Sequence, residues 1–203
     1  MNKFEELYKN TDSIGEFARG YFEYLFSVLN TLDLKSIEQL ANEFEEAREN
    51  GNTIFIAGNG GSATTASSMA NDIGFDVIKK TGTNKPFKVL ALTDNNSVIT
   101  AIANDVGYDN VFINQLKIHY RVGDKLLVIS ASGNSENVVR AANWVKEQEG
   151  KVIAFLGFSG GKLKGIADVI VHVKTGTGEY GPVEDVHLIL NHVLAHWFQH
   201  KIK

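Results

Sequence analysis

Two short segments of this sequence combine glycine with hydroxyl side chains in a way that suits the binding of a phosphate group. The first is Gly-Asn-Gly-Gly-Ser at residues 58–62, and the second is Ser-Ala-Ser-Gly-Asn-Ser at residues 130–135. Glycine lets backbone amides approach an anion, and the N-terminus of a following helix attracts negative charge. Two such loops at one edge of a sheet predict a phosphate site, with the rest of the ligand between them.

Two other interpretations of these loops deserve weight. Gly and Ser are common in tight turns and as helix caps, although three serines at i, i+2 and i+5 exceed what capping needs. The spacing Gly58-x-Gly60-x-x-Ala63 also fits a loose dinucleotide-binding pattern, which requires an acid about 20 residues further on. Asp94, the candidate acid, comes much later, and the serine-rich loop has no role in that scheme. The phosphate interpretation is therefore favoured over a nicotinamide cofactor.

The last helical segment carries a second group of residues that can do chemistry. His192, His196 and His200 are four residues apart, which places them on one face of a helix. Histidines near a helix C-terminus are commonly solvated or favoured by the helix dipole. His192 is in mid-helix, two turns after Glu184 and among apolar residues, so that it is either a satisfied core residue or a working base. Asn104-Asp105, which follows a short predicted helix, reads by itself as a turn.

Five short apolar runs alternate with helical stretches and predict the framework that positions these residues. Strands that alternate with helices indicate a doubly wound parallel sheet, an α/β fold, with helices on both faces. Ligands of such sheets lie outside the carboxyl ends of the strands. The runs are rich in β-branched residues and cover 53–57, 87–92, 125–129, 152–156 and 168–173.

The first fifty residues predict two helices that precede this core. Residues 12–31 carry apolar side chains on more than one face, and Asp33 is positioned to cap a second helix. We therefore expect a single domain over 1–203, with an N-terminal helical appendage (1–50) and an α/β core (51–203). Apolar groups that one core cannot bury indicate an interface, and so a homo-oligomer.

The composition excludes several classes of protein. The chain has 203 residues, no cysteine and a formal net charge of −4, so it offers neither a disulfide framework nor a cysteine nucleophile. No basic excess points to nucleic acid. Acidic residues stand where a signal peptide needs an apolar core, and no apolar run approaches the ~18 residues of a membrane span. We expect a cytoplasmic protein that binds neither nucleic acid nor membrane.

Taken together, the motifs resemble the sugar isomerase (SIS) domain family, and within it the phosphoheptose isomerases. The resemblance rests on the two loops, on 100–105, on the Gly160-Gly161-Lys162 turn within 157–166, and on 184–187 leading to His192. It implies a flavodoxin-like sheet, a homotetramer and a cytoplasmic enzyme. The implied reaction interconverts sedoheptulose 7-phosphate and glycero-manno-heptose 7-phosphate through an enediol, in the synthesis of bacterial heptose and lipopolysaccharide.

The resemblance also assigns roles to residues. It implies that the family's acid–base pair falls on Asp72 and His192, and that Asn104 and Asp105 contact the sugar. Ser130, Ser132 and Ser135 would hold the phosphate. The full set of substrate-binding positions that it implies is Asn59, Gly60, Gly61, Ser62, Asn104, Asp105, Ser130, Ala131, Ser132, Ser135 and Glu184.

Three positions depart from the family pattern at the chemical centre. The zinc-binding His of the family falls on Ser68, its metal-binding Gln on Glu184, and an Arg on Asp76. A divalent metal such as zinc would then be held by Asp72, Glu184 and His192, a donor set that has lost one imidazole. The alternative is a non-catalytic module that binds a sugar phosphate or a protein, like a relative that binds the bacterial replication initiator. Convergence of Asp72, Glu184 and His192 is the feature that distinguishes the two hypotheses.

Overall fold

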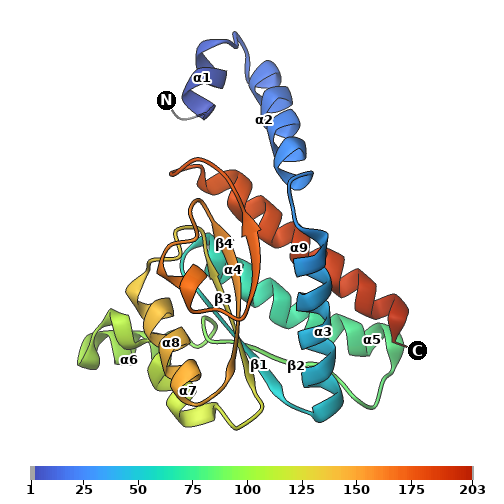
Figure 1. Cartoon of the computed structure of the whole chain (residues 1–203), viewed down its shortest axis with the longest axis vertical. Helices are drawn as coiled ribbons and strands as arrows, with labels where there is room; N and C mark the ends of the chain where they lie inside the picture. Colours follow the sequence, from blue (N-terminus) through green and yellow to red (C-terminus); the bar gives the residue numbers. More distant parts are fainter. Residues whose placement is uncertain (1–2, 203) are drawn as a thin grey trace.

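The core of the protein is a five-stranded parallel sheet, seen in a computed structural model that describes residues 3–202 (Figure 1). The strand order is β2-β1-β3-β4-β5, and every neighbouring pair is parallel. All six residues of β3 are buried, as expected for a strand covered on both faces. The strands are β1 (Thr53–Gly58), β2 (Lys88–Ala91), β3 (Lys125–Ser130), β4 (Lys151–Gly157) and β5 (Val169–Val173). The predicted α/β fold and its five strands are confirmed.

Helices cover both faces of this sheet and form two separate hydrophobic cores. One core lies between the sheet and the helices α3 (Leu34–Asn50), α4 (Gly61–Met69), α5 (Val77–Thr81) and α9 (Tyr180–Lys201). The other core lies under α6 (Asn96–Val106), α7 (Ile113–His119) and α8 (Glu136–Glu147). Short 3₁₀ turns at Tyr108–Asn110 and Lys162–Gly165 complete the second layer.

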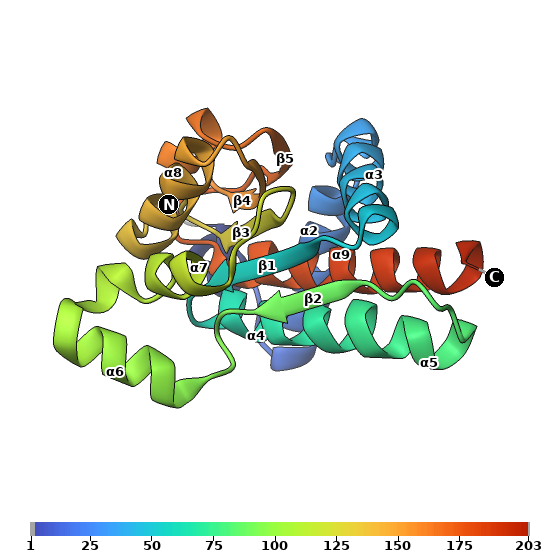
Figure 2. The same cartoon turned by 90° about the horizontal axis from the view of Figure 1, so that it is seen from below.

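A π-helical segment, η1 (Ala70–Asp76), joins α4 and α5 into one long rod. This rod packs against α9, and the two run side by side in both views (Figures 1 and 2). Such single π turns within α-helices are frequent at functional sites because they redirect side chains. The packing matters for the site because Asp72 lies in η1 and His192 lies in α9.

The N-terminal helices α1 (Lys3–Lys9) and α2 (Ile14–Leu29) stand away from the sheet, whereas α3 packs on it (Figure 1). Two tyrosines of α2 reach the beginning of α9: Tyr21 donates a hydrogen bond to Asp185, and Tyr24 donates one to Glu179. Phe22 and Phe26 are each 66% exposed on the remaining surface of α2. The prediction that this helix is apolar on more than one face is confirmed.

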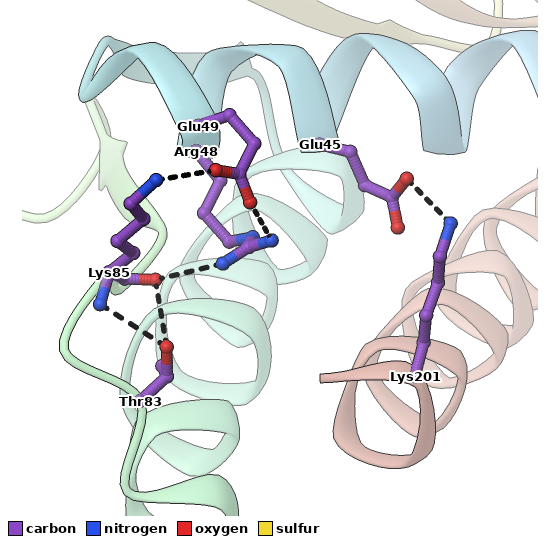
Figure 3. A network of polar contacts seen from close by, with 6 residues as sticks. All are labelled: Glu45, Arg48, Glu49, Thr83, Lys85 and Lys201. Atoms are coloured by element: carbon purple, nitrogen blue, oxygen red, sulfur yellow. Dashed lines mark hydrogen bonds and ion pairs between the residues drawn. The ribbon is translucent and has the colours of Figure 1, made fainter. Parts of the chain in front are cut away.

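A polar network ties α3 to the C-terminal end of α9 and to the loop before β2 (Figure 3). Glu49 accepts hydrogen bonds from Lys85, at 2.7 Å, and from Arg48, whose guanidinium also lies 5.6 Å from the centre of the Phe87 ring. Glu45 accepts from Lys201 at 2.7 Å. These cations are paired with acids of the chain itself, at the end of the sheet opposite the predicted loops. Within residues 3–202 no helix is both long and apolar enough to cross a membrane.

Candidate active site

The two predicted loops meet at the carboxyl ends of β1 and β3. They share a small cavity of about 130 Å³. Gly60 has a positive φ of 56°, which L side chains rarely adopt, and it directly precedes α4. The cavity is lined by Asn59, Ser62, Ile129, Ser130, Ala131, Ser132, Ser135, Tyr180 and Glu184. The convergence of Ser62 with the three serines of the second loop is thus observed.

The serine-rich loop is held in shape by the segment that follows β4. Gly133 has a φ of 65°, and a Cβ there would come 2.0 Å from the carbonyl oxygen of Gly160, so only glycine fits. The Ser130 hydroxyl accepts a hydrogen bond from the Gly133 amide at 3.0 Å, and Asn134 accepts one from the Lys162 amide at 3.0 Å. The Ser135 side chain makes no capping bond to α8, which leaves its hydroxyl available to a ligand.

A pair of asparagines joins the two loops, and the sequence analysis found only one of them. Asn59 and Asn137 exchange two hydrogen bonds of 2.9 Å each. Tyr108 donates a third hydrogen bond to Asn59, also at 2.9 Å. An amide side chain in the first turn of the helix after the serine-rich loop is the only sequence signal for Asn137. Asn137 is buried, and its two hydrogen bonds hold Asn59, which lines the cavity.

The structure does not bring Asn104 and Asp105 to the lining of this cavity. Both are exposed near the end of α6, which lies at the margin of the domain (Figure 2), and Asn104 donates a hydrogen bond to Asp105 at 2.8 Å. Tyr108, which follows α6, links this segment to the site through its hydrogen bond to Asn59. Their predicted contact with the sugar therefore has no geometric support within one copy of the chain.

Glu184 lines the cavity shared by the two loops. A Cβ added to Gly61 would lie 2.3 Å from the Glu184 Cδ, which shows that the carboxyl group packs against the backbone at the start of α4. Partial burial, and secondarily the negative charge of Asp185, raise the pKa of Glu184 above its usual range. The N-terminus of α4 has no side-chain cap of its own, so this carboxylate occupies the positive end of the helix dipole.

Asp72 and His192 face one another across the contact between η1 and α9. The His192 Nε2 lies 3.8 Å from the Asp72 Oδ2, with the Asp72 side chain 21% exposed and the His192 side chain 56% exposed. Asn191 donates a hydrogen bond of 2.6 Å to the same Oδ2, and Asn71 donates one of 2.9 Å to Oδ1. The pair therefore combines a held carboxylate with an imidazole open to solvent, an arrangement that suits proton transfer to and from a bound ligand.

The predicted metal set is not assembled. Among residues 3–202 no group of three or more His, Asp or Glu side chains lies close enough to hold a metal ion. Glu184 precedes His192 by eight residues on α9, an axial rise of ~12 Å, and its carboxylate is at Gly61. Ser68 supplies no imidazole in place of the missing ligand. Asp72, Glu184 and His192 thus do not fit a divalent metal in this geometry, and the predicted triad is corrected to an Asp72–His192 pair.

One further histidine of α9 is buried under the site. His187 is fully buried, and its ring lies 5.6 Å from the ring of Phe155 in β4. Burial, which penalises the charged form, lowers the pKa of His187 to about 4. The imidazole is therefore neutral at physiological pH and packs as part of the core. In contrast, His196 and His200 are exposed, and the ring of His200 is hydrogen-bonded to the His196 carbonyl at 2.8 Å.

The parallel sheet and the paired loops define a class, the SIS domain: residues 20–157 match the model of that family. A probable phosphoheptose isomerase of Thermoplasma acidophilum is 35% identical over 178 residues, which are 88% of this chain and 95% of that protein. The phosphoheptose isomerase of Aneurinibacillus thermoaerophilus is 35% identical over 80% of this chain and 79% of its own length. By these similarities, this chain belongs to the phosphoheptose isomerase family.

A solved structure agrees with this assignment. The phosphoheptose isomerase GmhA from Neisseria gonorrhoeae superposes with a TM-score of 0.80 at 29% identity, covering 93% of this chain and 100% of that one. The structure of NanR from Vibrio vulnificus, at 16% identity and a TM-score of 0.65, shares the fold alone. The predictions of an SIS fold and of a sugar-phosphate isomerase are confirmed.

Proposed function

We propose that this protein isomerises a heptose phosphate between its aldose and ketose forms, with sedoheptulose 7-phosphate and glycero-manno-heptose 7-phosphate as the pair. The observation that carries the proposal is the approach of Asp72, in η1, to within 3.8 Å of His192, in α9, the helix that also brings Glu184 to the cavity between the two loops. The ~12 Å axial rise between Glu184 and His192 is about the length of an extended seven-carbon sugar phosphate.

The phosphate end of the substrate binds without a principal Lys or Arg. The cavity lining consists of hydroxyl, amide, carboxyl and apolar side chains, with the N-termini of α4 and α8 beside it. Helix N-termini and hydroxyl donors supply the hydrogen bonds that a phosphate accepts. Ser62, Ser130, Ser132 and Ser135 are the donors, and Ala131 and Gly60 keep the backbone close to the ligand.

The chemical step moves one proton between neighbouring carbons. Asp72 or His192 removes the proton from C2 of the aldose, the electron pair forms the C1–C2 double bond of the enediol, and the C1 carbonyl oxygen gains a proton. Return of a proton to C1, with loss of the O2 proton, then yields the ketose. A carboxylate and an imidazole held together can share these transfers. No step is assigned to a metal, because the donors that the resemblance implies do not converge.

The assembly proposed for this function is a homotetramer in the cytoplasm. The exposed aromatic side chains of α2 support an interface between copies, since large exposed apolar groups mark contact surfaces. Closed D₂ symmetry is the usual arrangement for four copies. The heptose phosphate product would serve the synthesis of bacterial lipopolysaccharide.

A second candidate function is a module that binds sugar phosphates without converting them. The observation in its favour is that the metal donors implied by the resemblance do not assemble among residues 3–202, because the Glu184 carboxyl lies at Gly61 and Ser68 stands where the family has a histidine. The phosphate loops are intact under both hypotheses. Both an isomerase and a binding module should therefore bind the sugar phosphate, and a measurement of its conversion distinguishes the two.

The decisive experiment incubates the purified protein with a panel of ketose phosphates, with and without divalent metals and a chelator. We expect an aldose product from sedoheptulose 7-phosphate, and none from the Asp72→Asn, His192→Ala double variant. Binding of the ketose phosphate with no turnover under any metal condition would reject the isomerase and support the binding module.

A further inference from the structure

Asn191 is the side chain that holds the Asp72 carboxylate, and nothing in the sequence patterns pointed to it. Its Nδ2 donates a hydrogen bond of 2.6 Å to the Asp72 Oδ2, the same oxygen that lies 3.8 Å from the His192 Nε2. Asn191 is adjacent to His192 on α9, so a single helix carries both the imidazole and the group that aims the carboxylate at it.

The burial of Asn191 argues against a role in stability. Its side chain is 0% exposed, and its Oδ1 has no hydrogen-bond partner among residues 3–202. Buried polar atoms are nearly always paired, and an unpaired one costs free energy that an apolar side chain of the same shape would avoid. Leucine branches at the same carbon as asparagine, and it would suit the surrounding Leu190 and Leu194 without that cost.

The second hydrogen bond to Asp72 differs in kind. Asn71 is exposed and neighbours Asp72 in η1, so its bond to Oδ1 can be replaced by water. Asn191 comes from another element and is closed off from solvent, so that its bond fixes the carboxylate across the packing contact of η1 with α9. Of these two hydrogen bonds, the one from Asn191 therefore determines the orientation of the Asp72 carboxylate towards His192.

We propose that Asn191 is a positioning residue for the isomerisation: its buried amide holds the Asp72 carboxylate towards His192, in place of the metal coordination that this donor set does not provide. The inference rests on the proposed function, since it needs a reaction in which Asp72 and His192 take part. A displacement of about 1 Å at a reacting group can lower a rate by about 10²-fold.

The test compares Asn191→Leu with a matched core variant, Leu194→Ala, on the same helix. For Asn191→Leu we expect kcat to fall about 10- to 100-fold, with KM for the ketose phosphate within about threefold and Tm maintained. Leu194→Ala should lower Tm and leave kcat within about twofold when assayed below its Tm, because a large-to-small core change acts on stability. Asn71→Ala should lower kcat less than Asn191→Leu does, because water can replace its exposed hydrogen bond to Asp72. Wild-type kcat in Asn191→Leu would overturn the inference.

A second arm keeps failure of the inference apart from failure of the proposed function. Asn191→Leu should leave the Tm of the wild type unchanged but raise the Tm of Asp72→Ala by about 2–4 °C, because contacting residues couple and the buried amide loses its hydrogen-bond partner when Asp72 is removed. In turnover, Asn191→Leu should have no further effect on the residual rate of Asp72→Ala. A wild type without turnover would reject the proposed isomerase even if the Tm values couple. An active wild type with additive effects on rate and Tm would reject the role of Asn191.

Discussion

The carboxyl group of Glu184 lies directly against Gly61, the first residue of α4. This contact joins the first loop to α9. A Cβ at position 61 would come 2.3 Å from Cδ and 2.3 Å from Oε2 of Glu184. The contact joins the two elements that carry the opposite ends of the candidate site. A side chain at position 61 would therefore require the Glu184 carboxyl group to move, although Gly61 itself is helical.

Gly61→Ala should push the Glu184 carboxylate into the phosphate cavity. We expect affinity for the sugar phosphate to fall about tenfold, which corresponds to ~1.4 kcal/mol, with little change in Tm because the end of a flexible side chain can move. The double variant Gly61→Ala, Glu184→Ala should recover part of the lost affinity, since it removes the clash. Calorimetric titration of the wild type, Gly61→Ala and the double variant with the sugar phosphate measures these affinities. An unaltered affinity in Gly61→Ala would contradict the prediction.

Replacing Ser132 and Ser135 together by alanine should weaken binding of the sugar phosphate. Each substitution removes a hydroxyl group that donates a hydrogen bond to the charged phosphate. The expected loss in binding free energy is about 1–3 kcal/mol. Ser27→Ala is the matched control, because that hydroxyl bonds to the Tyr24 carbonyl on α2, away from the cavity. Equal affinity of the double variant and wild type would show that the phosphate binds elsewhere.

Loss of either member of the acid–base pair should affect turnover more than binding. Asp72→Asn and His192→Ala are each expected to lower kcat by about 10²–10⁴, the usual contribution of a placed acid or base. His196→Ala, one turn further along α9, is the control that should keep its activity. Asp72→Glu restores the longer acid of the family. We expect this variant to have a higher kcat than the wild type, because the shorter side chain of Asp72 limits its reach to the substrate. Full activity in the Asp72→Asn, His192→Ala double variant would mean that the centre is misplaced.

Burial of His187 makes the stability of the fold sensitive to acid. The pKa of this imidazole is about 4 in the folded protein and ~6.5 when unfolded, so the unfolded state binds more protons between these values. The free energy of unfolding should therefore decrease as pH falls from 6.5 towards 4, by up to about 3 kcal/mol from this group. Denaturant unfolding of His187→Leu should show a correspondingly smaller loss over that range. Parallel pH curves for the variant and wild type would refute this.

The aromatic surface of α2 should support assembly. Light scattering of the wild type is expected to give the mass of a tetramer at micromolar concentration, and Phe22→Asp with Phe26→Asp should dissociate it, since charges at an apolar contact are costly to bury. Val122→Asp, at an exposed position in the turn before β3, should leave the mass unchanged. A monomeric wild type would argue against the interface.

The strands and the phosphate loops were predictable because their determinants are local. Runs such as Leu-Leu-Val-Ile at 126–129 are apolar throughout, as buried parallel strands require, and glycine with serine at their ends marks a sharp turn into a helix. Asn59 could be recognised within such a loop, whereas its partner Asn137 could not. The pairing of these two residues depends on the adjacency of β1 and β3, which no short segment encodes.

The amino-acid sequence by itself determined the alternation of strands and helices, the location of the phosphate loops and the histidine spacing on the last helix, because each follows from a periodicity or a backbone preference within a few residues. Tertiary structure alone decided which side chains meet. The π turn of η1 and the packing of α9 bring Asp72 to Asn191 and His192, while Glu184, on the same helix, is directed to Gly61. Side-chain direction across a packed contact depends on the relative placement of two elements, and this is why the predicted three-residue metal set became a pair.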